Sequence, residues 1–184
     1  MRVVAERVAE VLPDGCRVEI LGGNLIVSRT PVPLHNWIVT RFMHQLLQQL
    51  PADKSPQSVT SVGVSKEESE DEDYAIPDLV VLPADVAKSA AGWLVPADCA
   101  ELALEVVSRG SSTTGTDAKP SAYADWEIAI YVLVDPRDGT IVLYADPRDG
   151  KYQNVHRMKF GDTVVLPEPL KDIRLETEEL STYG

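Results

Sequence analysis

Apolar residues recur every three or four positions over residues 2–12 and again over residues 34–50. This spacing places them on one side of a helix, so the sequence predicts a short amphipathic helix and a longer one. Between these segments, residues 17–20 and 25–28 flank a loop of two glycines and an asparagine, residues that tolerate positive φ. We therefore expect a β-hairpin between the two helices.

Apolar runs of the kind that form strands follow. Residues 102–107 and 130–134 are almost continuously hydrophobic, which is typical of a strand covered on both faces. Between them, capping residues predict a helix that begins around residues 116–120. Further strands are expected at 58–64, 79–82, 140–144, 152–156 and 163–166, with helical turns within 84–97 and in the acidic tail. This order predicts an α/β (α+β) fold with a mixed β-sheet, flanking helices and additional β-hairpins.

The composition, 44% hydrophobic and 25% charged, fits one ordinary domain over residues 1–184. No apolar run approaches the ~20 residues that a membrane span needs. We therefore expect a cytoplasmic protein with no membrane partner. Cys16 and Cys99 lack the spacing of a zinc site or a disulfide framework, and His35 and His44 are interpreted as packed or solvated helical residues.

The charge is strongly negative. Seventeen Lys and Arg residues stand against 29 Asp and Glu residues, for a formal net charge of -12, and residues 67–73 form an acidic run typical of a solvated loop. Such a field repels nucleic acid. A nucleic-acid partner would need a local basic strip, for which Arg29, Arg41 and Arg109 are candidates, or a bound metal ion.

Glu105 lies inside one of the apolar runs, where an isolated charge is costly. Compensation is expected from Lys119 or from a metal ion shared with Asp78, which enters another apolar strand. Two carboxylates on neighbouring strands can hold Mg²⁺ or Mn²⁺, with the carbonyl of Val106 as a third ligand. Lys119 could then stabilise charge on a phosphate, or orient and deprotonate a water molecule. The residues alone fit a structural buried ion pair somewhat better.

Several short motifs follow one another along the chain, and their order and intervals together are specific. They are Pro77-Asp78 before a valine-rich strand, Leu104-Glu105-Val106-Val107-Ser108, Lys119-Pro120-Ser121-Ala122-Tyr123-Ala124 and Tyr131-Val132-Leu133-Val134-Asp135-Pro136. In this order they resemble the Uma2 family (DUF820) of restriction-endonuclease-like proteins. The hairpin segment Gly23–Ser28, and the long helix opened by Pro31, Pro33 and His35, resemble that family too. The resemblance spans about residues 15–175.

The resemblance implies a fold of the PD-(D/E)XK nuclease superfamily, with the lysine moved from the glutamate strand to the next helix. It implies Asp78 and Glu105 as metal ligands and Lys119 as the catalytic lysine. The chain departs from the family pattern at two places. Gly115 stands where an acidic residue is usual, with Asp117 two positions before the lysine, and Trp126-Glu127-Ile128 stands where a glycine is usual.

Together, these observations predict an Mg²⁺-dependent endonuclease that hydrolyses phosphodiester bonds of nucleic acid, with DNA as the expected substrate and Mn²⁺ as a substitute ion. The first alternative is a nuclease-fold protein that binds nucleic acid or regulates without turnover. The second is a structural ion pair in an unrelated α/β domain. A homodimer is compatible with either nuclease-fold interpretation.

Overall fold

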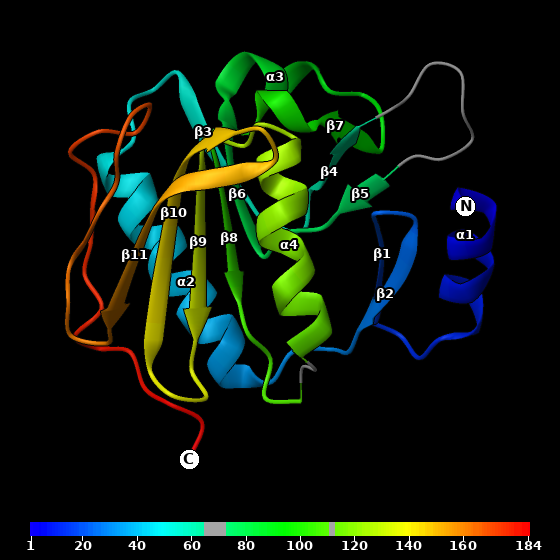
Figure 1. Cartoon of the computed structure of the whole chain (residues 1–184), viewed down its shortest axis with the longest axis horizontal. Helices are drawn as coiled ribbons and strands as arrows, with labels where there is room; N and C mark the ends of the chain where they lie inside the picture. Colours follow the sequence, from blue (N-terminus) through cyan, green and yellow to red (C-terminus); the bar gives the residue numbers. More distant parts are fainter. Residues whose placement is uncertain (65–72, 111–112) are drawn as a thin grey trace.

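A computed structural model describes residues 1–64, 73–110 and 113–184, without the side chains of residues 113–117. Within these residues the chain forms a large and a small β-sheet, with helices packed against them (Figure 1). The helices are α1 (Arg2–Val11), α2 (Pro33–Gln49), α3 (Ala84–Ser89) and α4 (Thr113–Asp125). None of the described helices is both long and apolar enough to cross a membrane.

The large sheet has six strands in the order β11-β10-β9-β8-β6-β3. Their bounds are β3 (Lys54–Gln57), β6 (Leu79–Pro83), β8 (Leu102–Val106), β9 (Ile130–Asp135), β10 (Thr140–Arg148) and β11 (Lys151–Lys159). Strands β8 and β9 run parallel, whereas the other neighbours are antiparallel. The predicted fold class, with its mixed sheet, is therefore confirmed.

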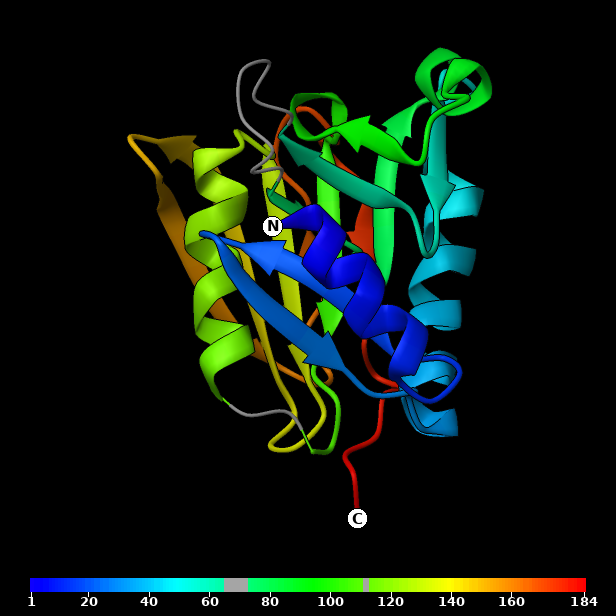
Figure 2. The same ribbon diagram turned by 90° about the vertical axis from the view of Figure 1, so that its right-hand side faces the viewer.

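The small sheet has the order β2-β1-β5-β4-β7. Its strands are β1 (Arg17–Leu21), β2 (Asn24–Ser28), β4 (Ser61–Val64), β5 (Asp73–Ala75) and β7 (Leu94–Pro96). A separate pair, β12 (Val164–Val165) and β13 (Arg174–Leu175), lies in the C-terminal segment. Helix α1 and the β1–β2 hairpin lie side by side at one end of the molecule (Figures 1 and 2).

Two helices cover opposite faces of the large sheet, α2 on one side and α4 on the other (Figure 2). Ile38, Phe42 and Leu46 of α2 are fully buried against one face, and Tyr123 of α4 is fully buried against the other. Strand β8 lies between these layers, and all five of its residues are buried. This arrangement explains the continuous apolar run, because neither face of β8 meets water.

Most of the predicted elements are present, with different bounds. Helix α4 begins at Thr113, before the predicted start, and β10 and β11 are longer than the predicted strands. The short strands β3, β5 and β7 were not expected; β3 has the sequence Lys-Ser-Pro-Gln, which carries no apolar pattern. The helical turn expected in the acidic tail is absent from residues 174–184. That residues 1–184 form one domain stays a prediction.

Candidate active site

The structure brings Asp78, Glu105 and Lys119 together at one end of the large sheet. Asp78 directly precedes β6, and Glu105 is the penultimate residue of β8. These strands pair antiparallel with Leu79 opposite Leu104, so the register extended by one residue sets Asp78 opposite Glu105. Lys119, from α4, reaches the same place. The sequence therefore identified three residues that tertiary structure makes neighbours.

Glu105 is 8% exposed, and its Oε1 atom accepts two hydrogen bonds. One comes from the Lys119 ammonium at 2.6 Å and the other from the Tyr123 hydroxyl at 2.7 Å. Its Oε2 atom forms no hydrogen bond with a described residue. Burial raises the pKa of Glu105; Lys119 opposes the rise, Asp78 and Glu19 add to it, and the result is a pKa of about 7.

Lys119 contacts a second carboxylate that the sequence analysis did not single out. Its Nζ atom lies 3.1 Å from Oε1 of Glu19, a β1 residue that is 1% exposed. Burial alone would lower the pKa of Lys119, but the charges of Glu105 and Glu19 outweigh burial and raise it. Lys119 is therefore a firmly protonated cation at neutral pH, held between two buried carboxylates.

Asp78 has both carboxylate oxygens occupied by hydrogen-bond donors. Arg17 Nη1 lies 2.8 Å from Oδ1, while Oδ2 accepts the backbone N–H of Val106 at 2.9 Å. His35 Nε2 lies 3.0 Å from the same Oδ2. Although burial alone would raise the pKa of Asp78, the contacts with His35, Val106 and Arg17 lower it below its ordinary value.

The interpretation of His35 as an ordinary packed residue missed its role in this cluster. It is 3% exposed in the first turns of α2, and its contact is with a predicted site residue rather than with solvent. His44, in contrast, is exposed as expected. For Glu19 a signal was available, because a charged residue inside the apolar strand Val-Glu-Ile-Leu has to be compensated.

Charges in the cluster are nearly balanced. Asp78, Glu105 and Glu19 contribute up to three negative charges, with Glu105 only partly ionised near pH 7, and Arg17 and Lys119 contribute two positive charges. Burial lowers the pKa of His35, but its hydrogen bond to Asp78 and the charge of that residue raise it above 6.5 overall. Proton uptake by His35 or by Glu105 can therefore adjust the balance of charge, which allows so many ionisable groups to be buried together.

The donor chemistry of this cluster fits a small hard cation. Mg²⁺ is commonly held by one or two carboxylates and keeps several waters. Asp78 and Glu105 supply two carboxylates across neighbouring strands, and Oε2 of Glu105 is not engaged by the described residues. Within the described part of the chain, no group of three or more His, Cys, Asp or Glu side chains is arranged to hold a metal ion. The carbonyl of Val106 as a third ligand stays a prediction.

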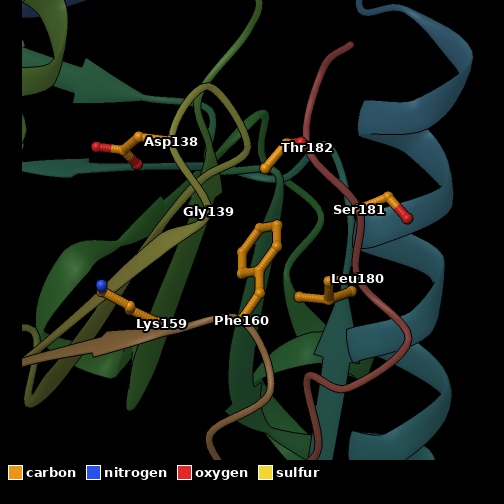
Figure 3. A pocket seen from close by; sticks show the side chains of 7 residues that line it. All are labelled: Asp138, Gly139, Lys159, Phe160, Leu180, Ser181 and Thr182. Atoms are coloured by element: carbon orange, nitrogen blue, oxygen red, sulfur yellow. The ribbon is translucent and has the colours of Figure 1, made fainter.

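Two predicted features lie outside the described part of the chain. The acidic run of residues 67–73 is described only at Asp73, and the side chains that would replace the usual acidic residue, near Gly115 and Asp117, are not described. Cys16 and Cys99 are free thiols, as expected. A cavity of about 480 Å³ lies elsewhere, between the β9–β10 turn and the C-terminal segment (Figure 3).

Comparison with known proteins identifies a family and a related fold. The model of the Uma2 family, described as "Putative restriction endonuclease", matches residues 6–178. A solved structure, a "putative nuclease belonging to DUF820" from Anabaena variabilis, superposes with a TM-score of 0.74 at 14% sequence identity, covering 96% of each chain. At this low sequence identity, the superposition shows a shared fold. No curated protein matches the chain. Because the family model covers nearly the whole sequence, this chain belongs to the Uma2 family, whose description supports a nuclease.

Proposed function

We propose that this protein is a metal-dependent endonuclease that hydrolyses phosphodiester bonds of DNA. The observation that carries the proposal is the buried cluster of Asp78, Glu105 and Lys119 at one end of the large sheet, in a chain of the Uma2 family. Buried charges with shifted pKa values concentrate at functional sites. A structural ion pair would need only one carboxylate for Lys119, whereas this cluster assembles three.

Asp78 and Glu105 would hold Mg²⁺, or Mn²⁺ in its place. The bound cation would polarise a phosphoryl oxygen and lower the pKa of a bound water. Arg17, His35 and the Val106 N–H fix the orientation of Asp78, and Tyr123 fixes that of Glu105. These contacts preorganise the carboxylates, so little reorganisation is required when the substrate arrives.

Lys119 would stabilise the negative charge that develops on the phosphate. Its raised pKa favours this electrostatic role over that of a base, since a firmly protonated ammonium does not accept a proton at neutral pH. A lysine that acts by charge should affect turnover far more than cation affinity, because it donates no lone pair to the cation.

The test combines cleavage with cation binding. Asp78→Asn and Glu105→Gln should each weaken the stabilisation by Mg²⁺ in a thermal-shift titration and abolish cleavage of labelled DNA. Lys119→Met should lower cleavage by about 10²–10³-fold while leaving cation affinity within a few-fold. Lys54→Met is the matched control, because Lys54 forms a comparably buried ion pair with Glu101 away from this site.

Three outcomes separate the alternatives. Cation binding without cleavage of DNA or RNA would support a nuclease-fold binding or regulatory protein. An absence of any cation response would favour a structural ion pair. Cleavage that survives Glu105→Gln, or that Lys54→Met reduces as strongly as Lys119→Met, would contradict the assigned site.

A further inference from the structure

Strand β11 is unusually basic for a protein with a net charge of -12. Its nine residues include Lys151, Arg157 and Lys159 and no carboxylate. All three cations are exposed, and none forms an ion pair with a described residue. By contrast, Arg41, a candidate from the sequence, is bound to Glu179. We call Lys151, Arg157 and Lys159 the β11 stripe.

The sheet register connects this stripe to the candidate active site. Glu105 pairs with Leu133, Leu133 pairs with Val142, and Val142 pairs with Arg157. Paired residues of neighbouring strands project from the same face of a sheet. Arg157 therefore lies in one row with Glu105 and on the same face, three strand spacings away, which is about 14 Å at ~4.8 Å per strand.

Lys159 continues the stripe beyond Arg157. It pairs with Thr140, which pairs with Asp135 at the end of β9. The carboxylate of Asp135 is neutralised by Arg137 at 2.7 Å, so it does not cancel the stripe. Asp138 lies on the same side of the cavity as Lys159 (Figure 3), and its Oδ1 atom accepts hydrogen bonds from Thr140.

The face between the site and the stripe is not covered along its whole width. Leu133 and Thr140 are partly exposed, whereas Val142, which lies between Leu133 and Arg157 in the row, is 5% exposed. Helix α4 contacts both β10 and β11, but near the ends of β8 and β9 it lies to one side of these two strands (Figure 1). β11 is also the edge strand of the large sheet. A chain of phosphates could thus reach the stripe and the carboxylates on one side of the sheet.

We propose that the β11 stripe binds the phosphate backbone of nucleic acid and places a phosphodiester at Glu105. This inference rests on the proposed function, which it extends by assigning the surface that holds the polymer. A row of cations on an edge strand complements regularly spaced phosphates, and it supplies the local basic strip that an acidic protein needs. The ~14 Å separation corresponds to about four base steps of duplex at 3.4 Å each.

The length of the substrate therefore distinguishes the stripe from the reaction centre. Bis(4-nitrophenyl) phosphate is too small to touch both, whereas a duplex of 20 or so base pairs reaches both. The variant is Arg157→Gln with Lys159→Gln. Its control is Arg7→Gln with Lys88→Gln, two exposed cations on α1 and α3 that give the same net charge.

Duplex binding is measured by fluorescence anisotropy in the Lys119→Met background, and cleavage of both substrates in proteins with Lys119 intact. The stripe variant should bind duplex at least about tenfold more weakly than its parent, and the control within twofold. The ratio of duplex cleavage to small-ester cleavage should fall by a similar factor. Arg157→Lys with Lys159→Arg should restore binding.

Several results would overturn the proposal that the β11 stripe binds nucleic acid. Unchanged duplex binding in the stripe variant, or an equal loss of binding in the control, would contradict it, as would a parent that binds no nucleic acid. Stripe-dependent binding of poly-glutamate as strong as that of duplex would also contradict it and would indicate an acidic protein partner. Failure of the proposed function has a different signature. The protein would bind duplex through the stripe and hydrolyse neither substrate.

Discussion

At the scale of single residues, the site is held by pairs of opposite charge that could not be buried separately. Glu105 would be costly to ionise alone, and Lys119 supplies the compensating charge at 2.6 Å. Glu19 shares that lysine and also accepts the Ile76 N–H at 2.7 Å, which joins β1 to the segment preceding Asp78. Breaking such a pair by removing one member typically costs ~3–5 kcal/mol. Substitutions here thus test stability and function together.

His35 provides a pH-dependent test of the Asp78 contact. Its pKa is raised above 6.5 in the folded protein, so its stabilising contribution is fully present below the unfolded pKa and is lost as pH rises through the folded pKa. We expect wild-type Tm to fall as the pH rises above about 6.5, and His35→Asn to remove part of that fall. The measurement is Tm against pH.

The pKa of Glu105 is also raised, so its ionisation lowers the stability of the folded protein as the pH rises from 4.5 to about 7. The informative quantity is therefore the difference in Tm between wild type and His35→Asn at each pH. His44→Asn, a change to an exposed histidine of the same helix, is the control. An identical pH dependence of wild type and His35→Asn would show that His35 does not gain a proton through Asp78.

At the scale of elements, α4 is the helix that carries the site chemistry. Lys119 and Tyr123 are four residues apart and therefore project from one side of the helix toward Glu105. The helix ends in a Schellman arrangement, in which Ile128 N–H bonds to Tyr123 O at 3.0 Å and Glu127 N–H to Ala124 O at 3.1 Å. This end fixes the turn that leads back into β9.

Glu127 adopts a left-handed φ of 59° at the position after the helix cap. Glycine adopts that conformation without the steric cost borne by other residues. We predict that Glu127→Gly stabilises the protein by about 1 kcal/mol, measured by urea denaturation. Glu127→Ala removes the same charge but keeps a Cβ atom and should give no such gain. Equal stabilisation by both variants would attribute the effect to charge.

At the scale of the whole molecule, a large negative charge coexists with local cation clusters. The net charge of -12 opposes a polyanion at long range, so few phosphates can be engaged and affinity has to come from short-range contacts. We expect the acidic run at residues 67–73 to strengthen this repulsion. That effect stays a prediction, because most of the run lies outside the described residues.

The salt dependence of duplex binding measures how many phosphates are engaged. Three stripe cations correspond to a slope of log K against log salt near −2.7, at about −0.9 per phosphate neutralised. Replacing Arg157 and Lys159 should make the slope shallower by about 1.8. Anisotropy titrations over a range of NaCl concentrations provide both values. A much steeper wild-type slope would mean that a larger basic surface contacts the backbone.

The sequence by itself determined most of the elements and three of the residues that meet at the candidate site, Asp78, Glu105 and Lys119. Helical spacing and continuous apolar runs predicted α1, α2, β8 and β9, because periodicity reports which side of an element is buried. A glutamate inside a buried run required compensation, which singled out Glu105 and left Lys119 or a metal ion shared with Asp78 as the compensating group. The acidic composition also required a local basic strip, although not its position.

Tertiary structure decided which distant residues meet. Glu19 and Lys119 are 100 positions apart, and Arg17 and Asp78 are 61 apart, so no local pattern relates them. The row that joins Glu105 to Arg157 likewise depends on the pairing of four strands. Sequence periodicity specifies the face of an element, whereas register and layer packing specify its neighbours. Periodicity placed Glu105 in a buried strand, whereas only register and layer packing brought Arg17, Glu19 and His35 to the site.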